Sequence, residues 1–327
     1  MRTFFASIIA CVVMLCACSA KQSVSESSVN KEDIPTSASL TAAPFDADSA
    51  YSYVKRQVDF GPRVPNTPAH KATGKWLADE LKRHGAQVRL LPATLKAHDG
   101  TRLEAINILG SYNPQAPERV LLIAHWDSRP FADMDPDPAN RTKPVPGAND
   151  GASGVGVLLE IARQLGKEAP DKGVDILFVD AEDWGDYNNE NSWALGTQHY
   201  VANMPADVYR PRYGILLDMV GGKGAVFPRE QFSQYYAPEL VTGLWETAQA
   251  LGYGNIFRNS VGAAVTDDHV EFIRAGIPVI DIIEYNQTTG FNPNWHTIAD
   301  DMDGIDSKTL GAVGTTVLTW LRQPLTP

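Results

Sequence analysis

The sequence predicts an α/β fold: a three-layer sandwich with a central, mostly parallel twisted sheet and helices on both faces. Two patterns predict it. Helix-like and strand-like segments alternate along most of the chain, as they do where helices connect the strands of a parallel sheet. Several strand-like segments are nearly continuous apolar runs, which fits strands buried on both faces.

The expected elements follow in chain order. The segment 47–58 carries apolar residues at helical spacing. A second helix is expected to begin at Pro68 and to end at Gly85, because proline is favoured in the first turn and glycine just past the last one. The strands expected after it are 105–109, 120–124, 174–179, 213–217 and 277–283. The remaining helices are expected at 153–165, 238–251, 269–275 and 307–321.

Composition excludes some classes of function. The 327 residues are 43% hydrophobic, and 28 Lys and Arg against 39 Asp and Glu give a net charge of −11. A protein that binds the phosphate backbone needs a basic surface, so nucleic acid is not an expected partner. No apolar run beyond the first residues reaches the roughly 20 residues that span a bilayer.

The N-terminus carries all three cysteines, Cys11, Cys16 and Cys18. Arg2 followed by an apolar run is typical of a secretion signal, and residues 15–18 resemble a bacterial lipobox. We therefore expect a signal peptide at 1–18, lipidation of Cys18, and membrane contact only through that anchor. The alternative is an ordinary signal peptide cut nearby. Ala20, where aspartate would favour the inner membrane, predicts the periplasmic face of a Gram-negative outer membrane.

The rest of the chain divides into two parts. Residues 19–44 are rich in Ser, Ala, Thr and Lys with hardly any large apolar side chains, so they cannot bury enough surface to offset the entropy of ordering, and we expect a disordered tether. Residues 45–327 show no internal repeat and no second low-complexity stretch. They are expected to form a single catalytic domain, and the protein is expected to be a monomer.

Polar side chains follow three of the expected strands. His125 and Asp127 come directly after one strand, Glu182 and Asp183 follow the next, and Asp218 ends a third. In open α/β sheets, ligands bind outside the carboxyl ends of the strands. Two adjacent acids after a buried strand repel each other and lose solvation unless a cation is present.

Two further residues join this set. Asp150 lies directly before an expected helix, and His296 lies in a polar loop before the last one. Taken singly, Asp150 fits a turn or helix cap, His125 a core histidine and His296 a surface loop. Taken together, histidine and carboxylate ligands without thiolate suit a catalytic zinc, for which three protein ligands suffice.

The order of these residues resembles the zinc aminopeptidase superfamily with co-catalytic metal sites, over roughly residues 50–322. Two stretches resemble one branch of it, the glutaminyl-peptide cyclotransferases, or glutaminyl cyclases, which are not peptidases. They are Thr266-Asp267-Asp268-His269 with the segment 272–279 after it, and Trp295-His296-Thr297 with Phe291 before it. The fold implied is zinc-exopeptidase-like.

The resemblance implies a role for each candidate. The zinc ligands would be Asp150, Asp183 and His296, with one zinc ion per chain. The general acid/base would be Glu182, beside a carboxylate network of Asp218 and Asp267. The substrate pocket would be walled by Trp295 and Phe291, and completed by Trp193 or Trp184.

The implied reaction converts the N-terminal glutamine of peptides or proteins to pyroglutamate and releases ammonia. The chain departs from the family pattern at two positions. Asp183 is an aspartate where glutamate is usual, and Asp281 stands where animal cyclases carry histidine, which indicates a bacterial branch. The family often has a cis peptide bond after the central aspartate, so the Asp150–Gly151 bond is a candidate.

Two other functions remain open from the sequence. His125, Asp150 and Asp218 could bind a second zinc ion, and a two-zinc aminopeptidase would use the same residues, with Glu182 activating water. The set of candidate ligands alone therefore does not distinguish an aminopeptidase from a cyclase. A non-catalytic, lipid-anchored binding protein would be expected to lack Glu182 or one of the ligands, and none is missing.

Overall fold

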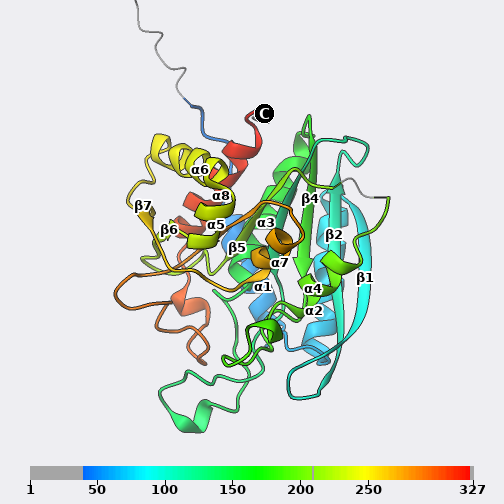
Figure 1. Cartoon of the computed structure of the whole chain (residues 1–327), viewed down its shortest axis with the longest axis vertical. Coiled ribbons are helices and arrows are strands. Elements are labelled where there is room, and N and C mark those ends of the chain that lie inside the picture. The colour runs from blue at the N-terminus through cyan, green and yellow to red at the C-terminus, as the bar shows by residue number, and fades with distance from the viewer. Residues whose placement is uncertain (1–39, 208–209, 325–327) are drawn as a thin grey trace, which may run out of the picture. The chain divides into compact units, whose positions relative to one another are not determined.

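A six-stranded sheet forms the centre of the domain (Figure 1). The computed structural model describes residues 40–207 and 210–324. The strand order is β1-β2-β4-β3-β5-β8. Its parallel part consists of β3 (Arg119–His125), β4 (Gly173–Val179), β5 (Tyr213–Asp218) and β8 (Val279–Ile283). β1 (Gln87–Lys96) and β2 (Arg102–Tyr112) add an antiparallel edge beside β4. The predicted mostly parallel sheet is confirmed.

Helices cover both faces of this sheet, and alternate residues of a single strand show it. Leu122 of β3 packs into a core cluster with residues of the helices on one face. These are α1 (Ala47–Asp59), α2 (Pro68–Arg83), α3 (Ala152–Lys167), α6 (Pro238–Ala250) and α8 (Ser307–Leu321). Its neighbours Leu121 and Ile123 pack in a second cluster with Tyr200 of α4 (Leu195–Ala202) and Phe272 of α7 (Asp268–Arg274). Burial on both faces explains the apolar runs.

Local sequence signals set several helix ends. The Thr67 hydroxyl accepts a hydrogen bond from the His70 N–H and caps α2, whose first residue is Pro68. Gly85 follows α2 with φ +88°, a left-handed conformation that favours glycine. The Asp306 side chain caps α8. The predicted start and end of α8 coincide with those observed.

The sequence analysis missed five short or exposed elements. These are β1, α4, α5 (Gln231–Tyr236) and the parallel pair β6 (Phe227–Arg229) and β7 (Phe257–Val261). None contains an apolar run, and β1 has only exposed and half-buried residues, with a proline inside it. The described residues also contain three single-turn 3₁₀ helices: η1 (Pro138–Asn140), η2 (Glu190–Ser192) and η3 (Met302–Gly304).

The predicted lipidation site, Cys18, lies outside the described residues, with the signal peptide and most of the predicted tether. The chain contacts the domain slightly before residue 45, because the Ala43 N–H donates to the Thr319 hydroxyl at 2.9 Å. Within residues 40–207 and 210–324, no helix combines the length and apolar character needed to cross a membrane.

Candidate metal centre and active site

The polar residues predicted at the strand ends meet at one edge of the sheet. His125 ends β3, Glu182 and Asp183 follow β4, and Asp218 ends β5. Asp150 lies just before α3, Asp267 caps α7, and His296 lies in the loop between β8 and η3. All of them are at least nine-tenths buried. Segments far apart in the chain therefore deliver one buried cluster of acids and histidines.

Two groups of three residues within this cluster have the geometry of a metal site, and they share Asp150. In the first, Asp150, Asp183 and His296 have ligand atoms within 4.8 Å of one another. His296 Nε2 lies 3.1 Å from Asp183 Oδ1 and 3.4 Å from Asp150 Oδ2. In the second, His125 Nε2 lies 2.9 Å from Asp150 Oδ1 and 3.2 Å from Asp218 Oδ1.

The first group fits zinc. Its donors are one imidazole nitrogen and carboxylate oxygens, the ligand types of catalytic zinc sites. Asp183 Oδ2 is buried and has no hydrogen-bond partner. A buried carboxylate oxygen without a partner is costly, and a cation removes that cost.

Backbone hydrogen bonds hold the ligand-bearing loops in place. Asp127 accepts from the N–H groups of Glu182 and Asp183, at 3.1 and 3.2 Å. Asp300 accepts from the N–H groups of Asn149 and Asp150, at 2.8 and 3.1 Å. These two acceptors fix the backbone on both sides of the metal group.

The backbone beside the site adopts rare conformations. Ala181, Met219 and His296 have φ values of 54°, 48° and 55°, and non-glycine residues in this region concentrate at functional sites. The Asp150–Gly151 peptide bond is cis. Gly151 packs directly under His125, and a Cβ atom at this position would overlap the imidazole ring.

Burial and crowding shift the protonation of these groups. Burial, with Asp183 and Asp267 nearby, holds the pKa of Glu182 well above its usual value. Burial also raises the pKa of Asp218 to about 7, against the opposing effect of His125. Burial lowers the pKa of His296, but the carboxylates of Asp183 and Asp150 outweigh it and raise that pKa to about 9.

A cavity of about 250 Å³ opens onto the first metal group. Asp150, Glu182, Asp183, Asp218, Asp267 and His296 line it. Its apolar walls include Trp295, Phe291 and Trp193. The Trp295 ring stacks on His296 with centroids 3.8 Å apart and lies 4.7 Å from the Phe291 ring. Three of the four predicted wall residues therefore lie at this cavity.

Trp184 does not. It packs in a separate core cluster with residues such as Val64 and Leu103, and its indole N–H donates to Asp99 Oδ2 at 3.3 Å. Of the two tryptophans named as alternatives for completing the wall, the structure places Trp193 at the cavity and Trp184 away from it. Trp193, by contrast, packs against Gly185, where a Cβ atom would overlap its ring.

The family model that describes peptidase family M28 matches residues 107–321, well over half of the chain and all of the candidate ligands. The chain belongs to peptidase family M28.

Solved structures place this M28 chain with the bacterial glutaminyl cyclases. It is 50% identical to the glutaminyl cyclase of Bacteroides thetaiotaomicron bound to N-acetylhistamine, with a TM-score of 0.85, over 87% of this chain and 100% of that one. It is 54% identical to a Zn-dependent exopeptidase of Parabacteroides distasonis, with a TM-score of 0.84 and the same coverage.

More distant sequence relatives carry the names of both activities. The glutaminyl-peptide cyclotransferase of Bos taurus is 27% identical over 76% of this chain and 74% of its own length. Aminopeptidase YwaD of Bacillus subtilis (strain 168) is 29% identical over 77% of this chain. The match spans only 52% of YwaD.

Sequence reasoning missed two residues of this M28 site. Tyr187 lines the cavity, and its hydroxyl lies 2.6 Å from His296 Nδ1. Arg129 is buried and contacts the carboxylate of Asp183 at 3.4 Å. Arg129 could have been proposed from its position, because it comes four residues after the end of β3, at the edge of the sheet where the candidate ligands lie. Tyr187 lies in a loop between Trp184 and Trp193 that carries no recognisable motif.

A third buried group of acids and a histidine lies next to the cavity residue Asp267. It joins Asp267 with His269 and Asp281, whose ligand atoms lie within 4.8 Å of one another. His269 Nε2 is 3.2 Å from Glu230 Oε2, and Nδ1 is 3.7 Å from Asp281 Oδ2. His269, which the sequence analysis left without a role, is thus enclosed by carboxylates.

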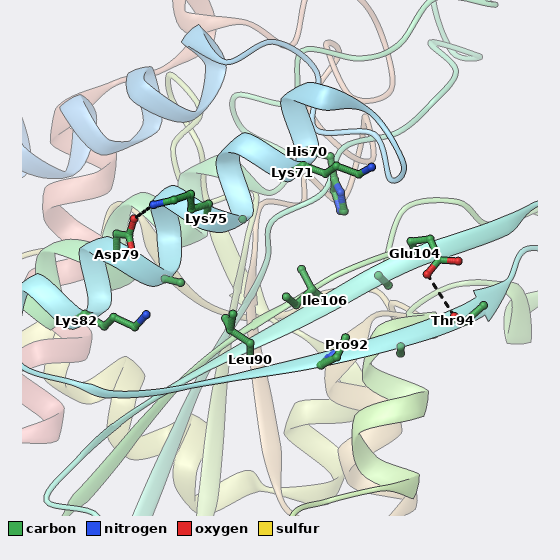
Figure 2. A pocket seen from close by; sticks show the side chains of 14 residues that line it. His70, Lys71, Lys75, Asp79, Lys82, Leu90, Pro92, Thr94, Glu104 and Ile106 are labelled. Carbon is green, nitrogen blue, oxygen red and sulfur yellow. Dashed lines mark hydrogen bonds and ion pairs between the residues drawn. The ribbon is translucent and has the colours of Figure 1, made fainter.

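A larger hollow of about 580 Å³ lies between α2 and the β1–β2 edge and shares no lining residue with the site (Figure 2). Lys71, Lys75 and Lys82 of α2 border it, over a floor that includes Leu90 and Ile106. Lys75 is already paired with Asp79 of the same hollow. None of the three metal-type groups found in the described residues lies there.

Proposed function

We propose that this chain is a glutaminyl-peptide cyclotransferase that converts the N-terminal glutamine of peptides or proteins to pyroglutamate, with one zinc ion per chain. The observation that carries the proposal is the aromatic wall of Trp295 and Phe291 beside the group of Asp150, Asp183 and His296. Similarity to bacterial glutaminyl cyclases at 50–52% identity, over 86–87% of this chain, supports it.

The reaction is an intramolecular substitution. The α-amino nitrogen of the substrate attacks its own γ-carbonyl carbon, a C–N bond closes the five-membered ring, and the amide C–N bond breaks to release ammonia. Because both reacting groups belong to one residue, most of the proximity is built into the substrate. When bound, zinc supplies Lewis-acid polarisation of a carbonyl oxygen.

Glu182 is the proposed general acid/base. It is buried at the cavity, next to the ligand Asp183. It takes the proton that the attacking nitrogen loses and delivers it to the leaving nitrogen, so the proton balance closes without water. The raised pKa of Glu182, caused by burial and by Asp183 and Asp267, suits a group that must hold and return a proton.

The pocket residues orient the substrate. Asp218 and Asp267 line the cavity near Glu182 and are the proposed carboxylate network that sets its proton affinity. Trp295, Phe291 and Trp193 enclose the glutamine side chain. The Trp295 indole N–H is the proposed donor to the γ-carbonyl oxygen.

A two-zinc aminopeptidase is the second candidate, because the group of His125, Asp150 and Asp218 is also intact. One structure of similar identity is named a leucine aminopeptidase precursor. In that case, water activated with the help of Glu182 would cleave the first peptide bond.

One experiment separates the two functions. Purified, zinc-loaded protein is incubated with a dipeptide that begins with glutamine, and both ammonia and product mass are measured. A product lighter by the mass of ammonia, with its peptide bond intact, supports the cyclotransferase. Free amino acids without ammonia would contradict it and support the aminopeptidase.

We further propose that Cys18 is lipidated and anchors the protein to the periplasmic face of the outer membrane through residues 19–44. The lipobox-like sequence at 15–18 supports this. In Gram-negative cells, wild-type protein and the control C16S should fractionate with outer membranes. C18S should not, and membrane-bound C18S would contradict the anchor.

A further inference from the structure

Arg129 is a buried cation next to the candidate metal ligand Asp183. It is 3% exposed. Its guanidinium holds Asp133 with two hydrogen bonds of 2.8 and 2.6 Å. It also donates to the backbone carbonyls of Asp183 and Gly185, at 3.1 and 3.3 Å. The rigid, forked geometry of a guanidinium suits such simultaneous contacts. Arg129 therefore joins a zinc ligand to the start of the loop 184–193.

Tyr187 connects the same arginine to the other side of the metal group. The Nε2 atom of His296 faces Asp183 and Asp150, and is thus the atom directed at the metal position. With zinc bound at Nε2 the imidazole would be neutral, so Nδ1 would carry its proton and donate a hydrogen bond to the Tyr187 oxygen, 2.6 Å away. The Tyr187 hydroxyl donates in turn to Asp133 Oδ1, at 3.4 Å. Arg129 holds Asp133 by two hydrogen bonds, so a continuous chain of contacts runs from the imidazole to the buried arginine.

Tyr187 also belongs to the aromatic wall. Its ring centroid lies 5.4 Å from that of Trp193 and 6.0 Å from that of Trp295. The Arg129 guanidinium lies 5.2 Å from the Tyr187 ring centroid and 4.9 Å from that of Trp193, within the range of cation–π attraction. The residues that hold the ligand His296 are therefore the ones that hold the wall of the cavity.

We propose that Tyr187, held by Arg129 and Asp133, is a positioning residue that orients the zinc ligand His296 and fastens the loop 184–193 to the metal site. The role of Tyr187 in zinc binding rests on the ligand geometry, and its role in shaping the substrate wall rests on the proposed function. Partners of this kind fix the tautomer and the orientation of a ligating histidine. Because Tyr187 contacts both His296 and the aromatic wall, zinc binding and the shape of the wall are coupled. A change in either one is then expected to affect the other.

The decisive variant is Y187F. Phenylalanine keeps the ring between Arg129, Trp193 and Trp295 and removes only the hydroxyl. We expect zinc affinity, measured on the full chain by competition with a chelator, to fall about 10–100-fold, the usual cost of losing such a partner. The matched control is Y235F, at a tyrosine of α5 that is 77% exposed and paired with Tyr236. It should bind zinc as the wild type does.

A second variant guards against an effect on folding. D133N removes the charge of a partly exposed carboxylate, 31% accessible, that accepts from both Arg129 and Tyr187. We expect weaker zinc binding here too, by a smaller factor than in Y187F, and an unchanged unfolding midpoint of the zinc-free protein. Wild-type zinc affinity in Y187F, or an equal loss in Y235F, would overturn the proposal.

The kinetic readout separates this proposal from the proposed function. At saturating zinc, Y187F should show a higher KM for a glutamine-initiated peptide with a smaller change in kcat, because the wall loosens while Glu182 remains. Zinc affinity needs no turnover. If the wild type released no ammonia while Y187F still bound zinc more weakly, the proposed function would fall and the positioning role would stand.

Discussion

The two groups that share Asp150 treat their histidines differently. His296 lines the cavity, and its outer nitrogen is held by Tyr187 at 2.6 Å. His125 does not line the cavity, and its outer nitrogen lies 3.6 Å from Asp127 without a hydrogen bond. The Nε2 atom of each histidine lies near two carboxylates: His125 beside Asp150 and Asp218, and His296 beside Asp150 and Asp183. Of the two, His296 alone also has the outer partner typical of a metal ligand.

The different surroundings of His296 and His125 bear on whether the site binds one zinc ion or two. Carboxylates outweigh burial and raise the pKa of both histidines, so this shift does not distinguish them. The two differ in that His296 lines the cavity and has Tyr187 at its outer nitrogen. The contrast supports our proposal of one zinc ion per chain, on the side of His296.

The largest effect is expected from replacing the histidine of the first group. H296Q should lose essentially all bound zinc and all activity, because it removes the only nitrogen ligand of the first group. H125Q, the matched change in the second group, should keep about one zinc ion per chain. Elemental analysis of the purified variants measures both. If H125Q lost zinc as H296Q does, the two groups would be equivalent and the one-zinc proposal would be wrong.

E182Q is expected to have the next largest effect. Glutamine keeps the size of the side chain but holds no transferable proton, so kcat should fall about 10²–10⁴-fold, while zinc content and the unfolding midpoint stay at wild-type values. Ammonia release and elemental analysis on one preparation test this. Wild-type turnover would remove Glu182 from the mechanism, and loss of zinc would make it part of the metal group.

The smallest effect is expected from a change in the aromatic wall of the cavity. W295F removes the indole N–H and part of the ring that stacks on His296, and should lower kcat/KM by about tenfold, equivalent to roughly 1.4 kcal/mol. W184F is the control, because Trp184 packs away from the cavity, and it should change kcat/KM by less than about twofold. Steady-state kinetics with a glutamine-initiated peptide decide this, and equal effects of the two variants would contradict the placement of the wall.

Much of the fold could be predicted from the sequence, because burial on both faces leaves a continuous apolar run. The four parallel strands β3, β4, β5 and β8, and the helices α1, α2, α3, α6, α7 and α8, all carried that signal or a helical period. The edge strand β1 carried neither, since all of its residues are exposed or half-buried and need no strict apolar pattern. Among the short elements, β6 pairs with β7 and α5 contacts β8, each across a long stretch of chain.

The sequence by itself determined the candidate residues, and only the tertiary structure decided their arrangement. His125, Glu182, Asp183 and Asp218 could be found because strand ends deliver ligands to one edge of a sheet. Neither the separation of Trp184 from Trp193 nor the contact of Tyr187 with His296 could be found in this way. Both depend on the path of the loop 184–193, which no local propensity sets. Arg129 and the aromatic rings fix that path by contacts between segments more than fifty residues apart in the chain.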